Sequence, residues 1–111
     1  MSSELIILVT VPSRDEGARI ADALVSERLA ACVNIVPGIE SVYRWEGKVQ
    51  RDQELLLIIK TAARRYDEVE RRVKELHSYT TAEVIACDIK YGSEDYLKWV
   101  RESTGDDRTQ E

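Results

Sequence analysis

Cys32 and His77 of this 111-residue chain have side chains that could bind a transition metal. A thiolate and an imidazole suit Cu(I), Cu(II) or Zn(II), whereas Mg²⁺ and Ca²⁺ prefer oxygen ligands. The chain contains one histidine and two cysteines, and they form no CxxC, HxxxH or HExxH motif. Because two ligands do not close a zinc or copper site, metal binding would need further ligands from neighbouring copies of the chain.

The same residues also have purely structural interpretations. A lone buried cysteine is more often a small apolar core residue than a ligand, and this applies both to Cys32 and to Cys87. His77 follows an amphipathic helical pattern, so its position suits a C-terminal cap favoured by the helix dipole. A ligand or pocket residue is the alternative for this histidine, because its charge changes near neutral pH.

Aromatic and charged side chains gather around Glu46-Gly47, where the glycine predicts a tight hairpin turn. They could line a cleft between subunits, and the alternative is that the aromatic rings only pack against the next chain. No Ser-His-Asp or Cys-His catalytic order and no glycine-rich phosphate loop is present, so we expect binding rather than catalysis. The candidate pocket residues are Tyr43, Arg44, Trp45 and Lys48, together with Tyr79 and Glu83 from a later segment.

The composition argues against two classes of partner. The formal charge is −5 at pH 7, with 21 acidic against 16 basic residues. This balance disfavours a nucleic acid and an anionic membrane surface as partners. The chain has two cysteines and no apolar run approaching the roughly 18 residues of a membrane span, so we expect free thiols and a cytoplasmic location.

Residues 31–61 predict a long β-hairpin around which the chain is organised. The stretch is rich in β-branched and aromatic residues, and Pro37-Gly38 predicts a bend within the first arm. At about 3.3 Å per residue, arms of roughly 12 to 14 residues would reach about 40 to 46 Å, so the hairpin should project from a domain of this size. An isolated hairpin is marginally stable in water, and we expect its far end to lie against another copy of the chain.

The remaining pattern predicts a ferredoxin-like α+β fold, a βαββαβ sandwich with a C-terminal helix. In this interpretation residues 1–104 form a single domain and residues 105–111 form a disordered tail, because the end of the chain has no apolar residue. The elements predicted outside the hairpin are a strand at Glu4–Val11, a helix at Arg14–Leu29, a helix at Arg64–Leu76, a strand at Glu83–Lys90 and a short helix after Ser93.

Unbroken apolar runs at Leu5–Val9 and Leu55–Ile59 predict strands that are covered on both faces. In a ferredoxin-like fold these are the two central strands, and both main helices cover the same face of the sheet. Large exposed apolar patches are rare on soluble monomers. We therefore expect another copy of the sheet to cover the open face.

Four segments resemble the CutA family of divalent-cation tolerance proteins, and the resemblance extends from Leu5 to Ser103. The segments are ACVNIVPGIESVYRWEGKVQ, ELLLIIKT, HSY and YGSEDYLKW. The resemblance implies a ferredoxin-like homotrimer, related in architecture to PII-type signalling trimers, in which the long hairpin and the edge strands join neighbouring subunits. It also implies a role in tolerance of copper and other divalent metals, with no established catalytic activity.

The resemblance implies only part of a metal site in this chain. Cys32 stands at the cysteine of the family's A-C-V-N segment, and His77 and Tyr79 match its His-Pro-Tyr-Glu segment. The departures are Ser78 for the proline, Thr80 for the glutamate and Ala82-Glu83 for the Pro-Glu that follows. A metal site that used Cys, His and that glutamate would lack one oxygen ligand here, unless Glu83 or Asp88 replaces it.

Two functions follow as hypotheses. The first is a non-enzymatic homotrimer of divalent-metal tolerance that binds copper or zinc between subunits through Cys32, His77 and Glu83. The second is a PII-like sensor that binds a small anionic metabolite or nucleotide between subunits and signals to a partner protein. RNA binding on the sheet would need aromatic residues on the central strands, and Leu55–Ile59 contains none.

Overall fold

The computed structural model describes residues 3–105, which form four strands and three α-helices. In chain order these are β1 (Glu4–Val11), α1 (Arg14–Ser26), β2 (Cys32–Trp45), β3 (Lys48–Ala62), a 3₁₀ turn (Ala63–Arg65), α2 (Tyr66–Leu76), β4 (Ile85–Asp88) and α3 (Glu94–Ser103). The predicted tail at residues 105–111 lies outside the described residues except for Gly105. None of the described helices is long and apolar enough to cross a membrane.

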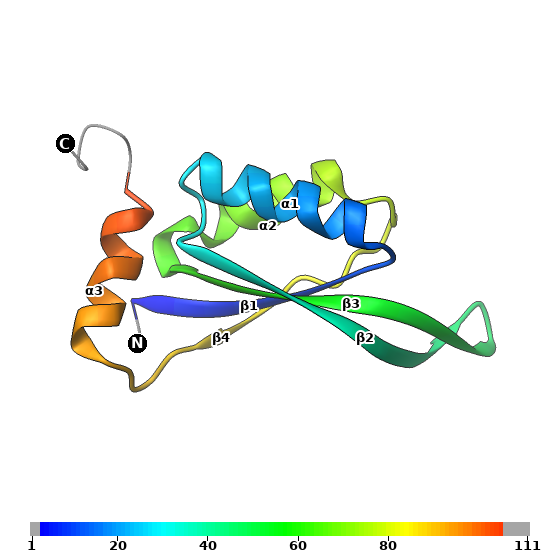
Figure 1. Ribbon diagram of the computed structural model, residues 1–111. Helices are drawn as coiled ribbons and strands as arrows, with labels where there is room; N and C mark the ends of the chain where they lie inside the picture. The colour runs from blue at the N-terminus through cyan, green and yellow to red at the C-terminus, as the bar shows by residue number, and fades with distance from the viewer. Residues whose placement is uncertain (1–2, 106–111) are drawn as a thin grey trace.

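The architecture is one antiparallel sheet with α1 and α2 packed on one of its faces (Figure 1). The strand order is β2-β3-β1-β4, and every neighbouring pair is antiparallel. Fully buried side chains from both layers form the core between helices and sheet, among them Ile7, Val9, Leu24 and Val69. The predicted ferredoxin-like fold is confirmed.

Helix α1 ends earlier than predicted, at Ser26 rather than at Leu29. Arg28 adopts a φ of 63°, in the left-handed region that ends a helix. The backbone N–H groups of Leu29 and Ala30 both donate to the carbonyl oxygen of Leu24, at 2.9 and 3.1 Å. The chain therefore reverses toward β2, and Leu29 is buried as part of this connection.

Strands β2 and β3 form a hairpin that projects beyond the rest of the sheet (Figure 1). Its turn residues Glu46 and Gly47 have φ values of 51° and 78°, the positive pair that a tight two-residue turn requires. The predicted bend is present as a register shift between Val36 and Ile39, with Gly38 at a φ of 78°. The molecule is 49 Å long and has a radius of gyration of 14.7 Å, against about 13 Å for a compact chain of this length.

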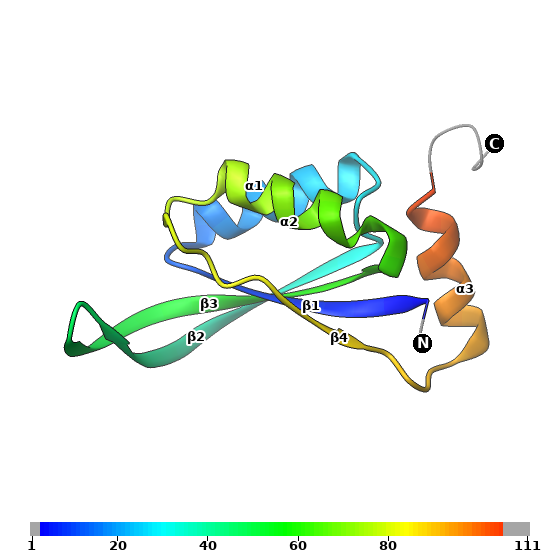
Figure 2. The same cartoon turned by 180° about the vertical axis from the view of Figure 1, so that it is seen from behind.

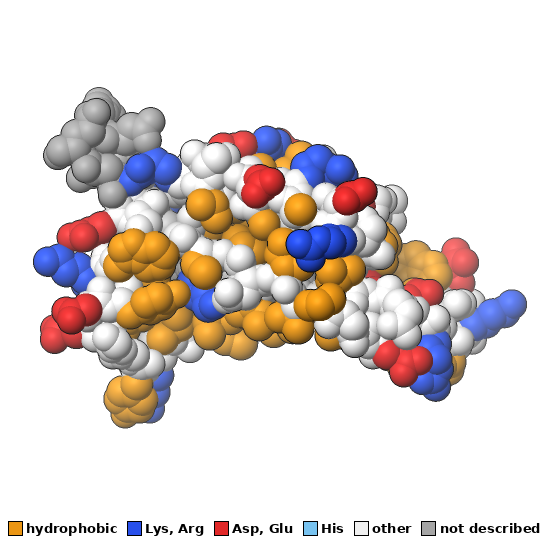
Figure 3. All heavy atoms as spheres, viewed as in Figure 1, with side chains coloured by type: hydrophobic (Ala, Val, Ile, Leu, Met, Phe, Trp, Pro, Cys, Tyr) orange, Lys and Arg blue, Asp and Glu red, His pale blue; other side chains and the backbone are white. Residues whose placement is uncertain are grey.

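The face of the sheet opposite α1 and α2 carries no helix layer (Figure 2). Side chains alternate along a strand, so Ile6 and Leu8 point away from the core that contains Ile7 and Val9. The strand registers place further apolar side chains beside these two, and Figure 3 shows hydrophobic atoms gathered along this side of the molecule. We call this surface the open face; its apolar members are Ile6, Leu8, Val36, Leu56, Ile58 and Ile85.

Strand β4 is an edge strand, and it is shorter than the strand predicted at Glu83–Lys90. It comprises Ile85–Asp88, which pair with Leu5–Leu8 of β1, and all four of its residues are exposed. The residues before it do not join the sheet, because they turn toward the hairpin and form one wall of the pocket described below. The other edge of the sheet is β2.

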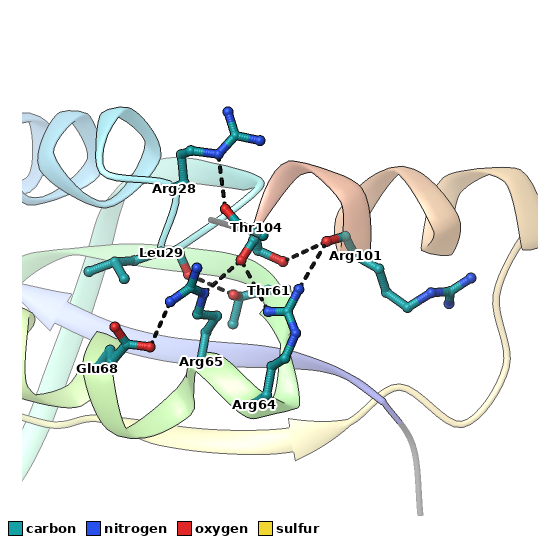
Figure 4. A network of polar contacts seen from close by, with 9 residues as sticks. Arg28, Leu29, Thr61, Arg64, Arg65, Glu68, Arg101 and Thr104 are labelled. Carbon is teal, nitrogen blue, oxygen red and sulfur yellow. Dashed lines mark hydrogen bonds and ion pairs between the residues drawn. The ribbon is translucent and has the colours of Figure 1, made fainter. Parts of the chain in front are cut away.

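Arginine side chains hold the C-terminal end of α3 beside the sheet (Figure 4). Arg65 Nε and Arg64 Nη1 donate to the carbonyl oxygen of Thr104 at 2.6 and 3.1 Å, and Arg28 Nε donates to that of Gly105 at 3.0 Å. The last carbonyl groups of a helix lack partners within the helix, and the helix dipole favours positive charge there. These contacts fix α3 against one end of the sheet.

Candidate ligand-binding site

A pocket lies between the outer part of the hairpin and the segment that leads from α2 into β4. Its volume is about 680 Å³, within the range of about 300–1,000 Å³ that is common for small-molecule sites. Its lining contains three aromatic rings and two carboxylates, and no Lys or Arg side chain of the described residues. The lining residues are Thr10, Ser41, Val42, Tyr43, Trp45, Glu54, Tyr79, Thr80, Thr81 and Glu83.

Glu54 of β3 forms the part of the pocket wall that the sheet provides. Its side chain is largely buried, and the residue is only 7% exposed. The hydroxyl of Tyr79 donates to Oε2 of Glu54 at 2.9 Å. Burial, together with this carboxylate, raises the pKa of Tyr79, so the phenol stays protonated and keeps donating. Within residues 3–105 no Lys or Arg side chain forms an ion pair with Glu54.

Only some of the predicted hairpin residues line the pocket. Tyr43 and Trp45 lie on one face of β2 and line the pocket, whereas Arg44 between them points to the other face. Lys48 pairs with Trp45 across the turn but does not belong to the lining. The hydroxyl of Tyr43 donates to Asp52, and this hydrogen bond raises the pKa of Tyr43. The pocket therefore contains the predicted aromatic residues without the predicted cations.

His77 supports the pocket from behind and does not line it. It is the C-terminal cap residue of α2, and its side chain is fully buried. Its Nδ1 accepts from the backbone N–H of Tyr79 at 3.0 Å, so Nε2 carries the proton that it donates to the carbonyl oxygen of Thr10 at 2.7 Å. The imidazole and the Tyr79 ring are also in contact, with centroids 4.7 Å apart. Both ring nitrogens are engaged, and the imidazole positions Tyr79 in the pocket wall.

Cys32 lies far from His77 within one chain. It pairs with Lys60 on β3, whereas Thr10, to which His77 bonds, pairs with Leu56. Four residues along a strand correspond to about 13 Å. Around Cys32 the neighbours are the Asn34 side chain, 4.0 Å from Sγ, and α3, where burial and this thiol raise the pKa of Tyr96.

No three His, Cys, Asp or Glu side chains of residues 3–105 are placed so that they could hold a metal ion together. Among the predicted metal ligands, Glu83 lines the pocket, His77 lies behind the pocket wall and Cys32 lies on the open face near α3. One copy of the chain does not bring these three residues together.

Six residues of the lining were not among the predicted pocket residues: Thr10, Ser41, Val42, Glu54, Thr80 and Thr81. Glu54 belongs to a polar stretch that predicts an exposed hairpin tip, but the structure buries it at the pocket. Its position directly before the apolar run of β3 was the available signal, because a residue at that junction sits at the edge of the core. Glu16 is also buried and accepts from the backbone N–H of Ser78 at 3.0 Å, and no sequence motif marks this contact.

The pocket continues the open face of the sheet. Strand β3 pairs with β1 without a register shift and alternates regularly past Leu56 to Glu54, so both side chains point to the same face. Thr10, the partner of Leu56, also belongs to the lining. The β1 pairing ends where Val11 meets Leu55, and the hairpin extends beyond this point. A second copy seated on the open face would therefore lie at the rim of the pocket.

The fold and the site define a class of protein: a ferredoxin-like domain with a projecting hairpin, an open apolar sheet face and a ligand-sized pocket between the hairpin and the segment after α2. The family model of the CutA1 divalent ion tolerance protein matches residues 5–103. The chain belongs to this family.

Individual relatives agree with this assignment. The divalent-cation tolerance protein CutA of Thermus thermophilus is 54% identical over 102 residues, which are 92% of this chain and 99% of that protein. The chloroplastic protein CutA 1 of Oryza sativa is 55% identical over 100 residues, but the match covers only 56% of that longer protein and 90% of this chain. The crystal structure of CutA1 from Oryza sativa superposes with a TM-score of 0.91 at 52% identity, over 95% of this chain and 96% of that one.

Proposed function

We propose that this protein is a homotrimer that serves divalent-cation tolerance by binding rather than by catalysis, with its binding site between subunits. The observation that carries the proposal is the open face, whose apolar side chains lead directly into the pocket. Burying such a surface against another copy stabilises the assembly by roughly 25 cal/mol per Å² of apolar area. Membership of a divalent-cation tolerance family supports the role.

The two edges of the sheet support a ring of copies. The edges are different strands, β2 on one side and β4 on the other. A contact between unlike surfaces is head-to-tail, and head-to-tail contacts close into a ring when the rotation between copies permits. Three copies in such a ring would direct their open faces toward a common axis, and each projecting hairpin would reach a neighbour.

In one version of this proposal, the ligand that binds between subunits is copper or zinc. Cys32 is half-buried on the open face, so a neighbouring copy could add ligands to its thiol. Glu83 is exposed at the pocket and could contribute a carboxylate oxygen. His77 could join only if the metal displaced one of its two hydrogen bonds. Two free cysteines fit a reducing compartment, and we place the protein in the cytoplasm.

Calorimetric titration of the metal-free protein with Cu(II) and with Zn(II) tests this version. We expect Cys32→Ser to weaken binding by at least about tenfold, because loss of a supporting partner alone typically costs a metal site 10- to 100-fold. Cys87→Ser is the matched thiol variant: Cys87 pairs with Ile6, so its exposed thiol also lies on the open face, and we expect the affinity to fall in Cys32→Ser and not in Cys87→Ser. Tight binding that survives in Cys32→Ser and in His77→Ala would exclude both residues from the metal site.

A small-molecule site is the second candidate function, and the size of the pocket favours it. A cavity of about 680 Å³ holds an organic ligand, whereas a bare metal ion needs only its own ligand shell. The position of the pocket beside the open face would place such a ligand between subunits. Ligand binding could then report to a partner protein through the hairpin or the segment after α2.

A further inference from the structure

We propose that the pocket binds a small organic cation, an ammonium or guanidinium compound, with its charge next to Glu54 and its body against the aromatic wall. The inference deepens the small-molecule function and rests on that proposal. It differs from the anionic ligand that the sequence suggests for a PII-like sensor.

The first step concerns the charge of Glu54. A carboxylate that is removed from water needs a compensating partner, because burial of an unpaired charge is unfavourable. The hydrogen bond that Glu54 receives in the pocket comes from the neutral hydroxyl of Tyr79, and no Lys or Arg of residues 3–105 forms an ion pair with it. A cationic ligand would supply the missing positive charge.

The second step concerns the aromatic wall. The rings of Tyr43, Trp45 and Tyr79 line the pocket, and each of these residues is more than one third exposed. Ring faces attract ammonium and guanidinium groups, with Trp the most effective. The hydroxyl protons of Tyr43 and Tyr79 are already donated to Asp52 and Glu54. What these two phenols still offer a ligand is ring face and oxygen lone pairs, which both favour a cation.

The third step excludes other ligand classes. The lining holds the carboxylates of Glu54 and Glu83, the carboxylate of Asp52 accepts from the Tyr43 hydroxyl, and neither Arg44 nor Lys48 is part of the lining. A phosphate or carboxylate ligand would therefore meet like charge. A bare divalent ion would find no set of three His, Cys, Asp or Glu ligands in the described part of the chain.

Calorimetric titration of the wild-type protein with agmatine and with tetramethylammonium tests the proposal, with ATP and citrate as anionic probes. We expect both cations to bind and both anions to fail. Glu54→Gln keeps the shape and removes the charge, and it should weaken both cations by about tenfold or more. Glu75→Gln makes the same change on the exposed surface of α2 and should have no effect. Trp45→Leu provides a second variant, which should weaken tetramethylammonium in particular.

The outcomes separate this proposal from the trimer. Binding of ATP or citrate in place of the cations would overturn the cation site, and so would cation binding that is unchanged in both Glu54→Gln and Trp45→Leu. Light scattering on the same samples reports the assembly independently. A trimer that binds neither cation would contradict the ligand class and leave the trimer standing, whereas a monomer that binds cations through Glu54 would support the site and contradict the trimer.

Discussion

Replacing Ile58 by glutamate should convert the proposed trimer into a folded monomer of 12.7 kDa. Ile58 lies at the centre of the open face, where it pairs with Leu8 on one side and with Asn34 on the other. A carboxylate at this position would have to be buried in every subunit interface, and an unpaired buried charge costs several kcal/mol. The fold itself should tolerate the change, because the side chain points away from the helices. Sedimentation velocity and far-UV circular dichroism measure the two effects.

The matched control is Val25→Glu. Val25 is an exposed valine on α1, on the layer opposite the open face. We expect this variant to sediment as the wild type does. A trimer that persists in Ile58→Glu would show that the open face is not the contact surface, and a trimer lost equally in both variants would show that the effect is not specific to that face.

Replacing His77 by alanine should lower the free energy of unfolding by about 2–4 kcal/mol without any metal present, because each buried group left unpaired costs about 1–3 kcal/mol. The change removes the partners of two backbone groups, the carbonyl of Thr10 and the N–H of Tyr79. Urea unfolding in the presence of EDTA measures this loss directly.

His77→Gln is the conservative control for this substitution. A glutamine has an amide donor and a carbonyl acceptor, so it can replace part of the hydrogen bonding, and we expect it to recover part of the stability. A metal-ligand role predicts a different pattern. Under that role, both variants would be as stable as the wild type in EDTA, and they would differ from it only when copper or zinc is added.

The long-range architecture follows from patterns that the chain displays plainly. The apolar runs of β1 and β3, the turn at Glu46-Gly47 and the bend at Pro37-Gly38 predict the hairpin and the central strands, and all four features are present. These patterns are local and strong. The ends of helices and strands are marked less clearly in the sequence. The residue with a positive φ after α1 is Arg28 and not a glycine, so the sequence does not show where this helix ends.

The candidate site was predicted only in part, because its assembly depends on tertiary structure. Tyr43, Trp45, Tyr79 and Glu83 converge, since the segment after α2 lies beside the outer part of the hairpin. The spacing of Cys32 and His77 in the sequence does not show whether the two side chains lie close together. The topology places them far apart along the sheet. The burial of a polar residue such as Glu54 depends on which distant segment covers it. The hydrophobic periodicity of the sequence carries no information about that contact.

Family membership and the pocket suggest different kinds of ligand for this chain. Divalent-cation tolerance names a role for the family without naming a ligand of this chain. The structure offers a ligand-sized acidic and aromatic pocket, and it offers a half-buried thiol on the open face. The proposed metal site needs ligands from a neighbouring subunit, whereas the pocket is formed within one chain and lies beside the face that the proposed trimer would cover.

Sedimentation equilibrium of the wild-type protein over a wide range of concentrations tests that assembly most directly. We expect a single species of three times the 12.7 kDa chain mass, which persists on dilution because the open face remains covered. A well-folded species of 12.7 kDa at every concentration would contradict the proposal, since the apolar side chains of the open face would then be stable in water without a partner.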